Sequence, residues 1–244
     1  MLHAFARNKS KAFNQYLPTR NPSEQRINSE DEITSLVFGP LEFLSASDNW
    51  KIWKAILQNN ASLSISGSLP PDFLADFSPT SVTYDFWPKK NRVEPDLVVE
   101  FLNDLGKSRS LLIELKWDAP PSGEDQLRKQ WLSFQDGKHA SSLHLFISKR
   151  ALQEPADLHL WSCREAGASI ENRLRQIRWH DFKHELVQQV LRRDASMSLR
   201  KWCELTSGFL HHLRIRPFVG FFRTLQLATA IEEEVNPHLV FWSK

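Results

Sequence analysis

Apolar residues concentrate in two short runs near the middle of the chain, each bounded by turn-forming residues. Residues 92–101 (RVEPDLVVEF) and 110–117 (SLLIELKW) are dense in Val, Leu, Ile and Phe, as buried strands are. The segment between them, 103–107, contains Asn, Asp and Gly and predicts a tight turn. The two runs therefore predict a β-hairpin whose turn is centred near Leu105.

The register of this hairpin brings charged residues together. A turn near Leu105 pairs residues whose numbers sum to about 210, which sets Asp96 opposite Glu114. Lys116 lies two residues beyond Glu114 on the same strand and therefore shares its face. Two carboxylates and a lysine thus converge on a sheet that is otherwise built for burial, where an unpaired charge costs on the order of several kcal/mol.

Other apolar patterns predict helices and strands on both sides of the hairpin. A helix is expected to start at Asn28, with Ser29 as N-cap and Glu32 completing a capping box. The Ser- and Pro-rich residues 60–90 contain one strand-like segment near 82–87, which is either part of a lid or the first strand of the sheet. Further helices are expected at 47–58, 123–131, 181–193, 198–213 and 222–234, and further strands at 142–147 and 158–162. This order predicts an α/β protein.

Pro95-Asp96 on one strand, followed by Glu114-x-Lys116 on the next, resembles the signature of the PD-(D/E)xK nuclease superfamily. The resemblance covers roughly residues 28–190. It implies a restriction-endonuclease-like core, in which a central mixed β-sheet is flanked by helices. It also implies that Asp96, Glu114 and the backbone carbonyl of Leu115 hold Mg²⁺ or Mn²⁺, while Lys116 positions or activates the attacking water. Oxygen ligands of this kind suit Mg²⁺, which can activate water beside a phosphate.

The same resemblance implies two further participants at the site. Family members often carry a glutamate on a first helix, and Glu32 is the nearest match, with Glu30 as the substitute. The alternative is that Glu32 only caps its helix. A glutamine often follows on the helix after the lysine strand, where Gln126 and Gln130 are the candidates and Gln126 is preferred.

The net charge of +2 conceals an uneven distribution. Residues 164–223 contain twelve Lys and Arg against six Asp and Glu, so this part is basic and the remainder is acidic. Basic side chains that neutralise phosphates are typical of nucleic-acid binding; the alternative is a set of solvated helix faces. The candidates for contact with DNA are Arg128, Lys129, Arg175, Arg178, Arg192 and Arg193.

Three segments are expected: a polar N-terminal arm (1–27), the nuclease-like core (28–190) and a basic, helical C-terminal extension (191–244). The chain contains no run of about eighteen apolar residues, and its N-terminus does not have the pattern of a signal peptide, so we expect a cytoplasmic protein without membrane contact. Cys163 and Cys203 are expected to be buried, reduced thiols. His180 and His184 have a spacing that suits zinc, but no third ligand follows at a persuasive distance.

The resemblance implies a metal-dependent nuclease acting on DNA, assisted by a second copy of itself or by a partner protein that supplies specificity. The resemblance further implies that the protein is a component of a defence or mobile-element system. Two alternatives stay open: an RNA-directed nuclease, and a non-cleaving DNA-binding or scaffold subunit with the same fold. A third is that Asp96 caps a strand while Glu114 and Lys116 pair as surface charges.

Overall fold

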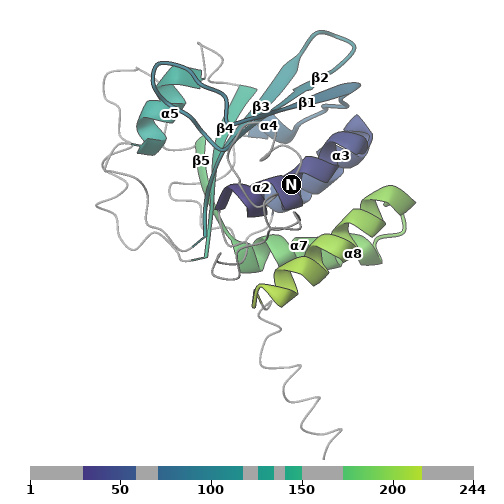
Figure 1. Cartoon of the computed structure of the whole chain (residues 1–244). Helices are drawn as coiled ribbons and strands as arrows, with labels where there is room; N and C mark the ends of the chain where they lie inside the picture. Colours follow the sequence, from purple (N-terminus) through teal and green to yellow (C-terminus); the bar gives the residue numbers. More distant parts are fainter. Residues whose placement is uncertain (1–29, 59–70, 118–125, 135–140, 150–172, 216–244) are drawn as a thin grey trace, which may run out of the picture.

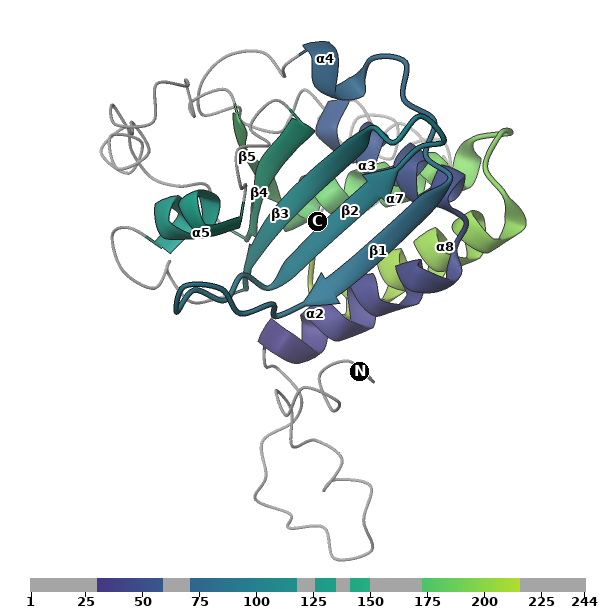
Figure 2. The ribbon, with the colours of Figure 1, turned by 90° about the horizontal axis from the view of Figure 1, so that it is seen from above.

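In the computed structural model, the described residues form one five-stranded mixed sheet in the order β1-β2-β3-β4-β5 (Figures 1 and 2). The structure describes residues 30–58, 71–117, 126–134, 141–149 and 173–215. Strands β1 to β3 pair antiparallel, whereas β4 and β5 run parallel to β3. The strands are β1 (Ser81–Phe86), β2 (Leu97–Leu102), β3 (Ser108–Lys116), β4 (Ser142–Ser148) and β5 (Leu174–Arg178). The expectation of an α/β protein with a helix-flanked mixed sheet is therefore confirmed.

The hairpin of β2 and β3 has the predicted register, since Leu97 pairs with Ile113 and each later pair keeps the same sum. Its turn is held by Asn103, whose Oδ1 accepts hydrogen bonds from the N–H groups of Leu105 (3.1 Å) and Lys107 (2.8 Å). Gly106 takes a φ of +70° in this turn, a conformation in which glycine avoids the clash of a Cβ atom. The local sequence thus explains the hairpin.

The first strand of the hairpin begins later than predicted, at Leu97 rather than Arg92. Asn91 and Arg92 have φ values of 51° and 63°, which reverse the chain instead of extending it. A single bridge between Lys90 and Val93 closes this reversal. The chain therefore enters β2 through a tight loop, and Asp96 lies at the end of that loop.

The longer helices lie where apolar periodicity and capping residues predict them, whereas the short helices at 39–43 and 71–74 were not predicted. The described helices are α2 (Glu30–Phe38), η2 (Gly39–Phe43), α3 (Ala46–Gln58), α4 (Pro71–Leu74), α5 (Gln126–Phe134), α7 (Trp179–Leu191) and α8 (Met197–His212). Pro40 ends α2 because proline cannot donate the next helical hydrogen bond. Ser196 caps α8 by accepting a hydrogen bond from the N–H of Leu199 at 3.1 Å. No helix among these residues is long and apolar enough to cross a membrane.

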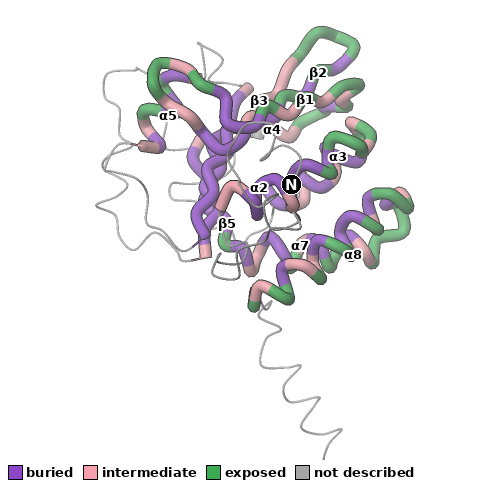
Figure 3. The backbone as a smooth tube through the Cα atoms, in the orientation of Figure 1, coloured by how far each residue is buried: buried purple, intermediate pink, exposed green. Residues whose placement is uncertain are grey.

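The sheet separates α5 from the other long helices (Figure 1). Consecutive residues of β3 and β4, whose side chains alternate between the two faces, are buried (Figure 3). On the face towards α2, α3, α7 and α8, the side chains of Val99, Ile113 and Leu145 are fully buried in one apolar core. On the α5 side, Glu114 and His144 take the alternate positions of β3 and β4. The two faces therefore differ in chemistry more than in burial.

The described part of the predicted C-terminal extension packs into the same core. Leu199 and Cys203 on α8 are fully buried among residues of the other helices, and Trp202 donates a hydrogen bond from Nε1 to the carbonyl of Val37 at 3.1 Å. Helix α8 therefore continues the core rather than standing apart from it. The predicted arm (1–27), the strand at 158–162 and the helix at 222–234 lie outside the described residues, as does Cys163.

Strand β5 is an element that the sequence patterns did not predict. It contains Arg175, Gln176 and Arg178 within five residues, which hides the apolar alternation of a strand. The strand forms because it pairs in parallel with β4 at the edge of the sheet, a tertiary contact that overrides local propensity.

Candidate active site

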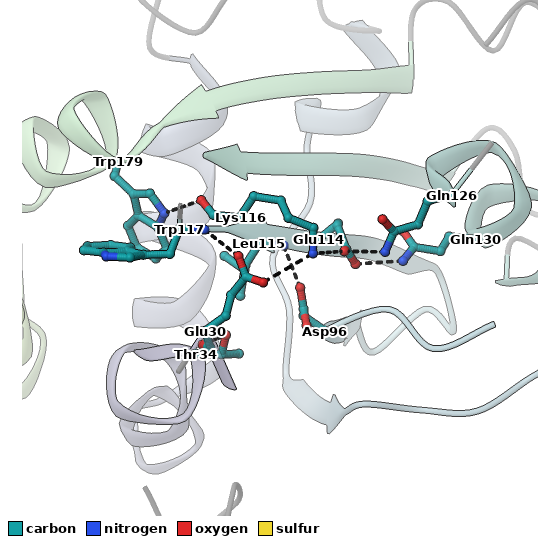
Figure 4. Close-up of polar contacts among 10 residues, drawn as sticks. All are labelled: Glu30, Thr34, Asp96, Glu114, Leu115, Lys116, Trp117, Gln126, Gln130 and Trp179. Atoms are coloured by element: carbon teal, nitrogen blue, oxygen red, sulfur yellow. Dashed lines mark hydrogen bonds and ion pairs between the residues drawn. The ribbon is translucent and has the colours of Figure 1, made fainter. Parts of the chain in front are cut away.

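Asp96 is placed by the loop that leads into β2. Its carbonyl accepts a hydrogen bond from the N–H of Trp87 at 3.0 Å, which ties the loop to the end of β1. Its side chain turns towards β3, where Oδ2 accepts the N–H of Leu115 at 2.7 Å (Figure 4). The last pair of the hairpin ladder is Leu97 with Ile113, and the same register extended by one residue sets Asp96 opposite Glu114, as predicted. The structure thus brings the two predicted carboxylates to the same end of β3.

Lys116 lies between two carboxylates at this end of the strand. Its Nζ is 2.8 Å from Oε1 of Glu114 and 3.4 Å from Oε2 of Glu30. The side chains of Glu114 and Lys116 are only 2% and 9% exposed, whereas that of Glu30 is 26% exposed. The other oxygen of Glu30 accepts the N–H of Trp117. Glu30 therefore links the first turn of α2 to the end of β3 (Figure 4).

Glu30, rather than the preferred Glu32, contacts the lysine. The two residues are separated by about 200° around the helix axis, since each residue turns by about 100°, so they face different sides of α2. Glu32 is buried elsewhere against the fold, with 5% of its surface exposed. The structure therefore corrects the expected geometry in favour of the substitute.

Both candidate glutamines on α5 reach Glu114. Gln126 donates its amide to Oε1 of Glu114 at 2.6 Å, and Gln130 donates to Oε2 at 2.7 Å. The two glutamines are four residues apart and therefore project from the same face of α5. Gln130 is fully buried, so the hydrogen bond from its amide nitrogen satisfies one oxygen of Glu114 away from water. The sequence ranked Gln130 second, although its spacing from Gln126 is a signal that both contribute.

A contact with helix α7 also holds the backbone of Lys116 in position. Trp179, the first residue of α7, donates a hydrogen bond from Nε1 to the Lys116 carbonyl at 3.3 Å. Its ring packs edge-on against that of Trp117, with centroids 5.3 Å apart. The sequence analysis did not identify Trp179 as a supporting residue, since only the tertiary fold brings α7 to this strand end.

The charges at the site shift one another's protonation equilibria. Burial and the charge of Glu114 raise the pKa of Asp96 well above its ordinary value, although the N–H of Leu115 and the charge of Lys116 oppose this rise. Burial lowers the pKa of Lys116, but attraction to Glu114, Asp96 and Glu30 outweighs burial and raises it above its ordinary value. Lys116 is therefore a charged ammonium at neutral pH.

The donor chemistry of the site fits an oxygen-preferring divalent ion. Oδ1 of Asp96 accepts no hydrogen bond from the described residues, and a nearby cation would stabilise the ionised form of this carboxyl group. Glu114 is more occupied, yet each of its oxygens can accept more than one interaction. Within the described ranges, no three His, Cys, Asp or Glu side chains form a ready-made metal-binding group. The metal role of the Leu115 carbonyl stays a prediction.

The predicted DNA-contacting cations are dispersed over the structure. Arg128 and Lys129 lie on α5, where Lys129 is exposed. Arg175 is buried in β5 with 6% of its surface exposed, and burial lowers its pKa, so it does not belong to an exposed basic face as expected. Arg178 is exposed and paired with Asp181 at 2.8 Å. Arg192 and Arg193 are exposed beyond the other end of α7.

The two histidines singled out as a possible zinc pair lie on α7. His180 has a pKa lowered by burial and by the charge of Arg178, and His184 is exposed. Neither belongs to a metal-binding group within the described residues.

Comparison of the chain with protein-family models, with curated proteins and with solved structures finds no match. The geometry of the site and the chemistry of its residues are therefore the basis for the functional argument.

Proposed function

We propose that this protein is a metal-dependent nuclease of the PD-(D/E)xK type that hydrolyses phosphodiester bonds in DNA. The observation that carries the proposal is the meeting of Asp96, Glu114 and Lys116 at one end of β3. The order of α2, the β2–β3 hairpin, α5 and β4 agrees with the order expected of a restriction-endonuclease-like core. A cytoplasmic setting, a second copy or partner protein, and a role in defence or in a mobile element belong to the same proposal.

The site divides the work of hydrolysis among residues of different chemistry. Asp96 and Glu114 would hold the ion, and Glu30 and Glu114 fix Lys116 between them. Lys116 can then donate a hydrogen bond to the attacking water or to a phosphate oxygen. A divalent ion bound there supplies polarisation of the phosphate, a more acidic water and stabilisation of the leaving oxygen. Hydrolysis joins the water oxygen to phosphorus, breaks one P–O ester bond and leaves the departing oxygen protonated.

The proposal is tested by comparing cleavage of plasmid, linear duplex, single-stranded DNA and RNA with Mg²⁺ or Mn²⁺. Asp96→Asn and Lys116→Gln should each lower the cleavage rate by roughly a hundredfold to ten-thousandfold, because each removes a group that acts on the reacting atoms. Asp104→Asn and Lys107→Gln are matched controls, since both residues are exposed in the turn of the same hairpin. Cleavage that is equal in the wild type and in Asp96→Asn would refute the proposal.

One observation favours a second function, a non-cleaving DNA-binding or scaffold subunit. Both oxygens of Glu114 are already in contact with protein groups, namely the side chains of Gln126, Gln130 and Lys116. Calorimetric titration with Mn²⁺ separates the two functions. Binding that is lost in Asp96→Asn supports the nuclease, whereas DNA binding without any metal binding supports the non-cleaving subunit.

A further inference from the structure

A cluster of cations lies at the turn between α7 and α8, at the opposite end of α7 from the candidate active site. We call it the corner cluster, and it consists of Lys51 on α3, Arg192 and Arg193 in the turn, and Arg200 on α8. Helix α7 has 13 residues and is therefore about 20 Å long. The corner cluster is thus remote from Lys116, which contacts the first residue of α7.

Two of these cations hold the turn in place. Lys51 donates from Nζ to the carbonyl of Asp194 at 2.7 Å. Arg200 donates from Nη2 to the carbonyls of Arg192 at 2.7 Å and Arg193 at 3.0 Å. Cations stabilise the carbonyl end of a helix, so these contacts have a structural role at the end of α7. Three helices are thereby fixed around one positively charged surface.

The other two cations contribute little to the turn. Arg192 pairs with Asp194 at 3.2 Å, but both side chains are more than half exposed, so water screens the pair. Arg193 is exposed, and its side chain makes no hydrogen bond or ion pair in the described part of the chain. Its charge is therefore directed to solvent without a structural function.

The corner cluster contains little negative charge to offset these cations. Asp194 is its exposed carboxylate. Asp48, nearby on α3, is buried to 8% exposure and accepts a hydrogen bond from Oγ of Ser196 at 2.7 Å. Four cations thus surround one exposed carboxylate. Such an excess attracts a polyanion, because each neutralised phosphate releases a condensed counterion.

We propose that the corner cluster binds backbone phosphates of duplex DNA, with Arg193 and Arg192 as the contacting residues and Lys51 and Arg200 as their support. The identity of the ligand rests on the proposed nuclease function, whereas the site itself rests on the contacts above. A duplex that reaches from Lys116 to the corner cluster spans about six base pairs, at about 3.4 Å each. The corner cluster therefore grips DNA beyond the bond to be cut.

The test is fluorescence anisotropy of a labelled DNA duplex with the full chain, without added metal, over a series of salt concentrations. Arg193→Gln should weaken binding roughly five- to tenfold at about 0.1 M salt and reduce the slope of log affinity against log salt by about one. Asp194→Asn should have the opposite effect on affinity and tighten DNA binding, because it removes the exposed carboxylate and releases Arg192.

Two control variants and a stability measurement complete the experiment. Lys201→Gln removes an exposed lysine of α8 that pairs with Glu204, and Asp104→Asn neutralises an exposed carboxylate in the hairpin turn; both should bind DNA like the wild type. Arg193→Gln should keep the Tm of the wild type, whereas Arg200→Gln should lower it because it removes the bonds to the turn.

The outcomes separate this proposal from the nuclease itself. Binding that is unchanged in both Arg193→Gln and Asp194→Asn, or a wild type that does not bind the duplex, overturns the corner cluster as a DNA site. Cleavage that persists beside unchanged binding leaves the nuclease standing without this site. Opposite shifts in the two variants without any cleavage support the corner cluster and count against the nuclease.

Discussion

The two faces of the central sheet are both buried, but they are built from different chemistry. Towards α2, α3, α7 and α8, the side chains of Val99, Ile113 and Leu145 are fully buried among other apolar groups. Towards α5, the buried side chains include Glu114 at 2% exposure and Gln130 at 0%. An apolar face is stabilised by packing alone, whereas a polar face requires a partner for each group. The second face can therefore support chemistry, and its buried carboxylate Glu114 depends on the donors of α5.

Two buried bases near the polar face, His144 and Lys116, have pKa values shifted in opposite directions. His144 is fully buried on β4, and burial lowers its pKa to about 3, so it is neutral at physiological pH. Its ring stacks on that of Trp131, with centroids 6.4 Å apart. Lys116 is also buried, yet three carboxylates raise its pKa. Burial alone neutralises a base, whereas burial beside opposite charges keeps it ionised.

The largest effect on stability is expected on the apolar face. Leu145→Ala should lower the free energy of unfolding by about 2–5 kcal/mol, because it leaves a cavity at a fully buried position. Leu102→Ala is the control, since Leu102 is 45% exposed, and it should cost much less. Urea denaturation measures both values. Equal effects of the two substitutions would contradict the description of this face as the main core.

An intermediate effect is expected from the polar face. Gln130→Leu should cost about 1–3 kcal/mol, because it keeps the volume but leaves one oxygen of buried Glu114 without its donor. Gln188→Leu on exposed α7 surface is the control and should have little effect. A double-mutant cycle of Gln130→Leu with Glu114→Gln checks the cause. Additive effects would show that the two side chains are not coupled.

The smallest effect is a pH dependence at the junction of the two faces. The pKa of Asp96 is raised in the folded state, so its contribution to stability is present below about pH 4 and is lost as pH rises through the raised value. Compared with the wild type, Asp96→Asn should therefore gain stability with rising pH. The N–H of Leu115 and the charge of Lys116 oppose the rise of this pKa but do not cancel it.

Melting temperatures from about pH 3.5 to 8 would measure this difference. Asp104→Asn, at an exposed carboxylate of the hairpin turn, is the matched control and should follow the wild type. Lys116 stays charged across this range, because its pKa is raised, and its contribution should remain constant. Parallel curves for the wild type and Asp96→Asn would show that Asp96 has the same pKa in the folded and unfolded states.

Local sequence predicted the elements that depend on near neighbours. The hairpin register followed from its turn, and the helix expected at 47–58 is α3. Strand β5 was missed because its arginines obscure the alternation. Arg175 was expected to contact DNA because it lies in the basic part of the sequence, but it is buried in this strand. Where several polar residues interrupt an apolar pattern, periodicity carries too little information to identify the strand.

The sequence by itself determined that Asp96, Glu114 and Lys116 meet, because a two-stranded hairpin is governed by its own turn and by the two-residue period of its strands. Only the tertiary structure decided that Glu30 contacts Lys116 across 86 residues. It likewise decided that Lys51 and Arg200 converge on one turn from different helices. Such contacts depend on how helices dock onto the sheet, and docking is set by the packing of the whole core rather than by any local pattern.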